Sequence, residues 1–193
     1  MAMIVSFGEI IDIIIMTFVV GYIFIDVAKQ FNISRVPIYG FDWKSFKFAC
    51  FATAPALILH ELFHKFVAIA FGLNAVFHAS YFWLGFGAVL KFLNSPFLFF
   101  VPAYVSIGCA LPCKVSLVDS AVVAFAGPFA NLLLFVISRE LLKSSRLKFR
   151  RRALLYVTKQ INLFLFVFNM LPFPLFDGFK VYEGLFFVVR MLF

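Results

Sequence analysis

Two histidines four residues apart, with a glutamate directly after the first, are the residues of this 193-residue chain best suited to chemistry. They are His60, Glu61 and His64, in the run His-Glu-Leu-Phe-His. Residues four apart lie on the same face of a helix, so both imidazoles can bind one metal ion. The glutamate then lies beside that ion, where it can accept a proton from water. The pattern predicts a catalytic metal site on a helix, with Glu61 as general base.

A catalytic zinc site of this kind needs a third protein ligand and keeps one position open for water. The acidic residues in or near apolar segments are Glu9, Asp12, Asp26, Asp119 and Asp177. Asp177 stands out because it follows Pro172 and Pro174, which end a helix, and precedes Gly178, which permits a tight turn. Such a backbone can aim a carboxylate inward. A helix-terminal aspartate at the membrane surface is the alternative on these residues alone.

The composition of the chain indicates where these residues must lie. Hydrophobic residues make up 64% of it and charged residues 13%, whereas soluble domains are about half apolar and a quarter charged. We therefore predict an α-helical integral membrane protein. Its length suits one membrane-embedded domain over residues 1–193, with a catalytic core at about 48–180 and no room for a regulatory module.

Four segments are long and apolar enough to be transmembrane helices, which need about 20 such residues. They cover residues 10–27, 48–72, 120–138 and 153–171. The second contains both histidines, and the fourth ends just before the two prolines. The residues after Asp177 are too few for a full span and predict a partial or interfacial helix.

The segment between the second and third spans does not read as a helix. Residues 81–90 are rich in aromatics and carry two glycines, and residues 92–113 contain three prolines. We predict short membrane-associated strands and a re-entrant loop here. Irregular backbone at that depth must be covered by protein or line a water-filled cavity.

The net charge of +8 comes largely from one loop between the third and fourth spans. Its basic residues are Arg139, Lys143, Arg146, Lys148, Arg150, Arg151 and Arg152. A basic cluster beside apolar spans is typical of a topology determinant that faces anionic lipid. The predicted partner is therefore the lipid bilayer and not nucleic acid.

Three motifs, in this order along the chain, resemble those of the site-2 protease family. The first is His60-Glu61-x-x-His64, and the second is Ala126-Gly127-Pro128-x-x-Asn131. The third is Asn169-x-x-Pro172-x-Pro174-x-x-Asp177-Gly178. The first motif alone occurs in many soluble proteases, whereas the spacing of the third is specific. The chain is similar to a compact member without a PDZ domain.

The resemblance implies an intramembrane zinc metalloprotease, which hydrolyses peptide bonds of membrane-protein substrates within or near the bilayer. It implies Zn²⁺ as the cofactor, with His60, His64 and Asp177 as its ligands and Glu61 as the base. Zinc would activate water, and the glutamate would pass the proton to the leaving amine. Since the sequence shows no disulfide framework or eukaryotic targeting signal, the expected location is a prokaryotic cell membrane, which the chain crosses several times.

The resemblance also implies roles for two asparagines. Asn169 would position substrate or stabilise the oxyanion, and Asn131 would contact substrate or pack between helices. We expect Gly127 to be a site of close helix contact. The chain departs from the family at Phe179, where a second small residue is frequent. It also departs in its basic loop, because the positive-inside rule and the family topology give opposite orientations.

Other functions are compatible with part of this pattern. A zinc protease acting on lipidated or signal-peptide remnants would use the same chemistry. A membrane metal-binding or transport protein would explain histidine and aspartate in a span, but not a glutamate between the two histidines. A non-catalytic scaffold would not need all four matched catalytic positions.

Overall fold

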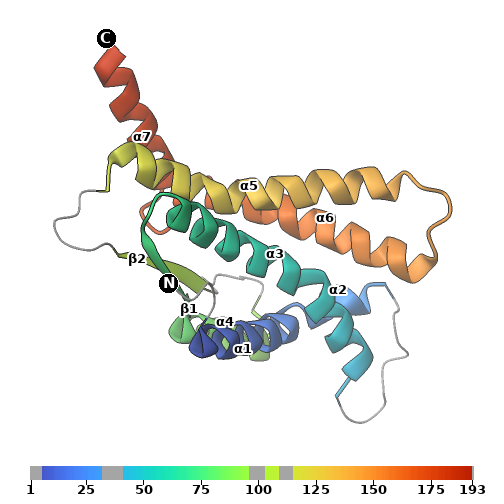
Figure 1. The fold of residues 1–193 in the computed structure, drawn as a ribbon. Coiled ribbons are helices and arrows are strands. Elements are labelled where there is room, and N and C mark those ends of the chain that lie inside the picture. Colours follow the sequence, from blue (N-terminus) through green and yellow to red (C-terminus); the bar gives the residue numbers. More distant parts are fainter. Residues whose placement is uncertain (1–5, 32–40, 96–102, 109–114, 193) are drawn as a thin grey trace.

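The computed structural model describes residues 6–31, 41–95, 103–108 and 115–192, and these residues are mostly helical (Figure 1). The helices are α1 (Phe7–Ile23), α2 (Ile25–Lys29), α3 (Trp43–Ala70), α4 (Tyr81–Phe92), α5 (Leu117–Leu142), α6 (Phe149–Asn169) and α7 (Asp177–Leu192). The strands are β1 (Asn74–Ala79) and β2 (Ala103–Gly108). The predicted helical class is therefore confirmed.

Helix α3 lies between α1 on one side and the hairpin of α5 and α6 on the other (Figure 1). It begins where the carboxylate of Asp42 accepts a hydrogen bond from the backbone N–H of Ser45, at 3.1 Å. Its packed positions carry small residues, among them Ala49, Ala52 and Ala56, all at most 2% exposed. Small side chains let the neighbouring helices approach closely, which brings their polar groups within reach of one another.

All four predicted spans are helical, with different boundaries. Helix α1 stops at Ile23, and the short α2 follows it, whereas α3 begins at Trp43 and α5 continues to Leu142. Within the described part of the chain, α3 and α5 are the two helices that have the length and composition needed to cross a membrane. The residues after Asp177 form α7, in agreement with the short C-terminal helix predicted there.

Both strands lie between the second and third predicted spans, in the region where short strands were predicted. Residues 81–90 belong to α4, so the prediction of strands there is wrong. The buried residues of this helix are Leu84 and Gly87, three apart, which shows that a helical period governs its contacts. Strand β1 precedes α4, and β2 lies in the stretch predicted to re-enter; residues 96–102 and 109–114 of that stretch lie outside the described residues.

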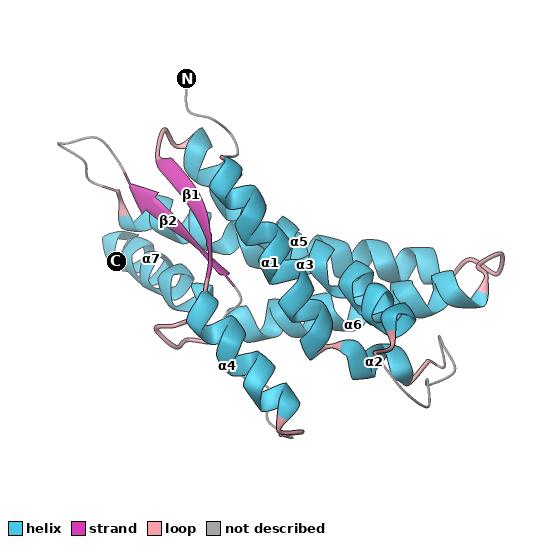
Figure 2. Cartoon of the chain, turned by 90° about the horizontal axis from the view of Figure 1, so that it is seen from below, coloured by secondary structure: helices cyan, strands magenta, loops and turns pink. Residues whose placement is uncertain are grey.

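Strands β1 and β2 pair in antiparallel fashion, with Phe77 opposite Val105 and Ala79 opposite Ala103. The sheet packs against α1 and the C-terminal part of α3 (Figure 2). Phe77 is 2% exposed and joins a buried cluster with Met16 of α1 and Leu57 of α3. The sheet is thereby held beside the part of α3 that carries the two histidines.

Candidate metal centre

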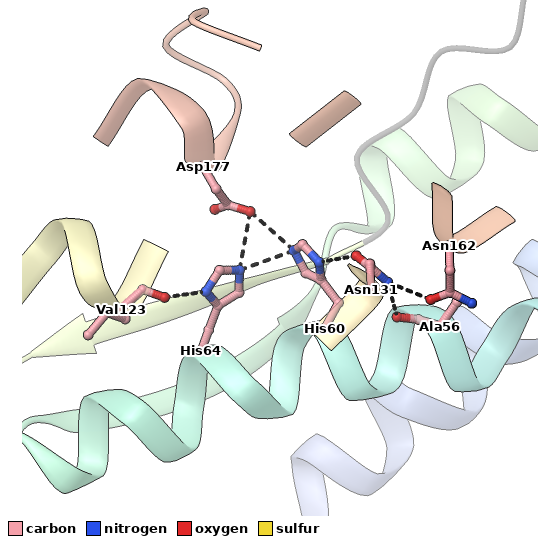
Figure 3. A network of polar contacts seen from close by, with 7 residues as sticks. All are labelled: Ala56, His60, His64, Val123, Asn131, Asn162 and Asp177. Atoms are coloured by element: carbon pink, nitrogen blue, oxygen red, sulfur yellow. Dashed lines mark hydrogen bonds and ion pairs between the residues drawn. The ribbon is translucent and has the colours of Figure 1, made fainter. Parts of the chain in front are cut away.

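His60 and His64 project from α3 toward Asp177, the first residue of α7 (Figure 3). The Nε2 atoms of the two imidazoles are 3.1 Å apart. Oδ2 of Asp177 lies 3.1 Å from Nε2 of His60 and 3.2 Å from Nε2 of His64. Residues 117 positions apart in the sequence therefore form one compact triangle of ligand atoms.

The backbone after α6 delivers the carboxylate of Asp177 to this triangle. Helix α6 ends at Asn169, and the chain then turns so that Phe176 N–H donates to the carbonyl of Phe173, at 2.9 Å. A Cβ on Gly178 would lie 2.5 Å from the carbonyl carbon of Met170. Because no Cβ tolerates such a contact, glycine is required where the turn passes the end of α6.

The other ring nitrogen of each imidazole faces an oxygen acceptor. Nδ1 of His60 lies 2.6 Å from Oδ1 of Asn131, and Nδ1 of His64 lies 2.7 Å from the backbone carbonyl of Val123. Both Nδ1 atoms must therefore carry the proton, which leaves the lone pairs of both Nε2 atoms directed at Asp177. Three electron-rich atoms then converge at about hydrogen-bond distance, and a cation is needed among them.

The size of the triangle suits zinc. Zinc binds nitrogen and oxygen at about 2.0–2.1 Å in a tetrahedron, so its ligand atoms are about 3.3 Å apart. The observed separations of 3.1–3.2 Å are close to this value. Gly127 of α5 provides a second indication, because a Cβ there would lie 2.3 Å from Nε2 of His64 and 2.7 Å from Nε2 of His60. The space into which both nitrogens point is thus kept free of side chains.

A cavity of about 220 Å³ opens over the triangle. It is lined by the three ligands, by Glu61 and Asn169, and by residues of β2. Glu61 is 6% exposed, and its Oε2 has no hydrogen-bond partner within the described residues.

One known protein is similar over most of the sequence. The chain is 33% identical over 179 residues, which are 90% of this chain and 82% of the relative, to a protein of Methanocaldococcus jannaschii named "Putative zinc metalloprotease MJ0611". The chain belongs to this zinc metalloprotease family. No family model matches the sequence, and no solved structure matches it. Zinc as the predicted cofactor agrees with both the family and the ligand triangle.

The structure places the residues predicted from the sequence of this metalloprotease in two groups. His60, His64, Asp177, Glu61 and Asn169 line one cavity. The side chain of Asn131 instead lies behind His60, fully buried, and its amide nitrogen donates to the carbonyl of Ala56 and to Oδ1 of Asn162 (Figure 3). No part of it lines the cavity, so the predicted contact with substrate has no support in this geometry.

Two supporting residues of the zinc metalloprotease were missed from the sequence. Val123 contributes only a backbone carbonyl, which leaves no trace in the choice of side chain. Asn162 is completely buried in α6 and holds Asn131 in place. Asn162 could have been found from the sequence as a polar amide inside a predicted span, because burying such a group there without a hydrogen-bond partner costs free energy.

Proposed function

We propose that this chain is an intramembrane zinc endopeptidase of the site-2 protease type, which hydrolyses peptide bonds of membrane-protein substrates. The observation that carries the proposal is the position of Glu61. Its carboxylate is buried, has a free oxygen within the described residues, and lines the same cavity as the three ligand atoms. A site that only stored or transported a metal would have no use for a buried carboxylate held beside the ligands but bonded to none of them.

Each polar residue of the cavity has a distinct role in this proposal. Zinc, when bound by His60, His64 and Asp177, supplies a Lewis acid that polarises a carbonyl and activates water. Glu61 accepts the proton of that water and returns it to the leaving amine. Asn169 lines the cavity from the end of α6, where its amide can donate to the oxygen of the scissile carbonyl.

Asn131 acts through His60 and not on the substrate. Its amide oxygen accepts the Nδ1 proton of the imidazole, which fixes the tautomer and the orientation of the ring. The carbonyl of Val123 does the same for His64. Both imidazoles are thereby preorganised for binding the metal.

The proposed location is the lipid bilayer, which the chain crosses several times. Helices α3 and α5 have the length and composition of spans. Other helices expose large apolar side chains, among them Phe18 of α1, Phe164 of α6 and Phe186 of α7, at 55%, 51% and 67%. So much exposed apolar surface is unfavourable in water and favourable against lipid. A substrate embedded in the same bilayer can reach the cavity by lateral diffusion.

A helical substrate must unfold locally before its carbonyl can be attacked, and we propose that strand β2 stabilises the extended form. Strand β2 lines the cavity through Ala103, Tyr104, Val105 and Ile107. An extended peptide added along this edge would pass directly over the ligand triangle.

The hydrogen-bond pattern of the sheet supports this edge. The backbone N–H groups of Phe77 and Ala79 donate to side chains of α1 and not to β2. Since the bonding direction alternates along an antiparallel strand, their partners Val105 and Ala103 direct their peptide groups to the outer edge of β2. Within the described residues no other strand pairs with this edge, so its peptide groups can pair with a substrate strand.

The central experiment compares wild type with Glu61→Gln in detergent, by zinc content and by cleavage of a single-span membrane peptide. We expect both proteins to bind one zinc per chain and only wild type to cut, with activity of the variant lower by at least about 100-fold. Equal cleavage by the variant, or absence of zinc from wild type, would overturn the proposal.

A proline at position 105 tests the strand edge. Val105→Pro removes one N–H that faces outward and leaves the pairing with β1 intact, because proline is tolerated on such edges. We expect a clear loss of cleavage with full zinc content. Unchanged cleavage would show that the substrate does not pair with β2.

A further inference from the structure

Two carboxylates of α1 cover the outer edge of β1. Oε1 of Glu9 accepts the backbone N–H of Phe77 at 2.7 Å, and Oδ2 of Asp12 accepts that of Ala79 at 3.1 Å. Glu9 and Asp12 are three apart in a helix, so their side chains lie on the same face of α1. Phe77 and Ala79 are two apart in a strand, so their backbone N–H groups point to the same edge of β1. The carboxylates therefore take the place that another strand would occupy.

Glu9 also connects the sheet to the metal-binding helix. Its Oε1 forms an ion pair with Nζ of Lys65, the residue that follows the ligand His64, and its Oε2 accepts the backbone N–H of Ser6 at 2.6 Å. Glu9 is 3% exposed and Lys65 is 2% exposed. One buried carboxylate thus joins α1, α3 and β1 beside the site.

Stability alone does not account for this ion pair. Two charges lose their hydration when they are buried, and apolar residues of similar size often stabilise a fold equally well or better. Apolar residues could not, however, accept the N–H of Phe77. An oxygen is therefore needed at this position to hold β1 in place through the N–H of Phe77.

We infer that Glu9 and Asp12 are positioning residues: they close the β1 edge to other strands and hold the sheet over the metal ligands. Among the described residues, β2 is then the edge of the sheet that no other strand covers, and α1 sets its distance from the ligand triangle from the opposite side of the sheet. The part of this inference that concerns substrate pairing with β2 rests on the proposed function.

A matched pair of double variants isolates the oxygen acceptor from the ion pair. Glu9→Gln/Lys65→Met and Glu9→Leu/Lys65→Met both remove the two charges, so neither leaves a buried ion without a partner. Both lose the acceptor of the Ser6 N–H, and they differ in that glutamine keeps one oxygen for the N–H of Phe77 whereas leucine keeps none. If the ion pair only stabilises the fold, both double variants should show the same amide exchange of β1 and the same KM.

The first readout is amide exchange of the β1 segment by mass spectrometry in detergent, which needs no activity. We expect the glutamine variant to keep the protection of wild type and the leucine variant to exchange about tenfold faster or more, because a buried N–H loses its acceptor. Zinc content should stay at one per chain in both.

The second readout is the kinetics of cleavage of a membrane peptide. We expect KM to rise about tenfold in the leucine variant with kcat within about threefold, and the glutamine variant to restore KM. Asp12→Leu against Asp12→Asn repeats the comparison at Ala79, where no buried lysine is involved.

The outcomes separate this inference from the proposed function. If wild type cuts and both double variants share its exchange and its KM, Glu9 has no positioning role, although the protease assignment stands. If wild type binds zinc but does not cut, the proposed function fails, and the exchange of β1 alone decides whether α1 holds the sheet. Equal exchange in both variants overturns the inference in either case.

Discussion

Gly127 is the position at which adding a single methyl group, in Gly127→Ala, should abolish tight zinc binding. A Cβ there would lie 2.3 Å from Nε2 and 2.6 Å from Cε1 of His64, and 2.7 Å from Nε2 of His60. These are the two nitrogens whose lone pairs face Asp177. Gly127→Ala therefore places a carbon where the two ligands converge.

The size of the effect follows from these distances. Ordinary contacts of a Cβ begin at 3.4 Å, so the imidazoles must retreat by roughly 1 Å. A metal site tolerates deviations of about 0.2 Å in its bond lengths. We expect zinc affinity to fall by at least about 100-fold, which corresponds to about 2.7 kcal/mol. The helix itself should not suffer, because alanine is favoured over glycine in a helix interior by about 1 kcal/mol.

The assay is a chelator competition in detergent that gives the Kd for zinc, accompanied by circular dichroism. Gly85→Ala is the matched control, because it makes the same substitution in helix α4, where the new Cβ has no neighbour within 4 Å among the described residues beyond its own stretch of helix. The control should bind zinc like wild type, and both variants should keep their helical content. Wild-type zinc affinity in Gly127→Ala would refute the placement of the ligands.

Three further predictions concern the supports of the site. Gly178→Ala forces a Cβ to 2.5 Å from the carbonyl carbon of Met170, so it should displace Asp177 and lower zinc affinity about as much as Asp177→Ala does, measured by the same competition. Asn131→Leu removes the acceptor of the Nδ1 proton of His60 and should weaken zinc binding by about 10–100-fold, without raising KM for substrate at saturating zinc. A chelator should lower the melting temperature of wild type and leave that of Gly127→Ala unchanged, because stabilisation by a ligand requires a site that binds it.

Much of the site could be predicted from the sequence because its chemistry is local. His60, Glu61 and His64 belong to one helical turn, and their spacing alone determines that they share a face. Asp177 was marked by the prolines before it and the glycine after it, which predict a turn at a helix end. Local motifs of this kind keep their meaning whatever the rest of the fold does.

Residues 81–90 show where this reasoning failed. Aromatic residues favour a strand by propensity and glycines disfavour a helix interior, but Leu84 and Gly87 are buried at helical spacing in α4. Tertiary contacts outweighed propensity, which is weak over so short a segment. The two strands of this predicted region lie on either side of α4, at Asn74–Ala79 and Ala103–Gly108.

The partners of the buried charges were also beyond prediction. Glu9 and Lys65 are 56 residues apart, and no local pattern links them. From the sequence, Glu9 was one of several carboxylates near the ends of apolar segments. Its role depends on the register of β1 against α1, which only the folded chain determines.

Two glycines indicate how residues that support the metal ligands could also be recognised from the sequence. Gly127 and Gly178 are both positions where a Cβ would meet the metal site or the turn that completes it, at 2.3 Å and 2.5 Å. Each lies in a sequence motif that also contains a site residue, Asn131 in one case and Asp177 in the other. The sequence predicts close helix contact at Gly127, whereas the nearest atoms to a Cβ there belong to the ligand side chains of His64 and His60. A glycine beside polar residues in a long apolar helix can therefore leave room for a binding site and not only for a neighbouring helix. Gly127→Ala distinguishes the two, because a role in helix packing alone predicts lost stability with zinc affinity retained.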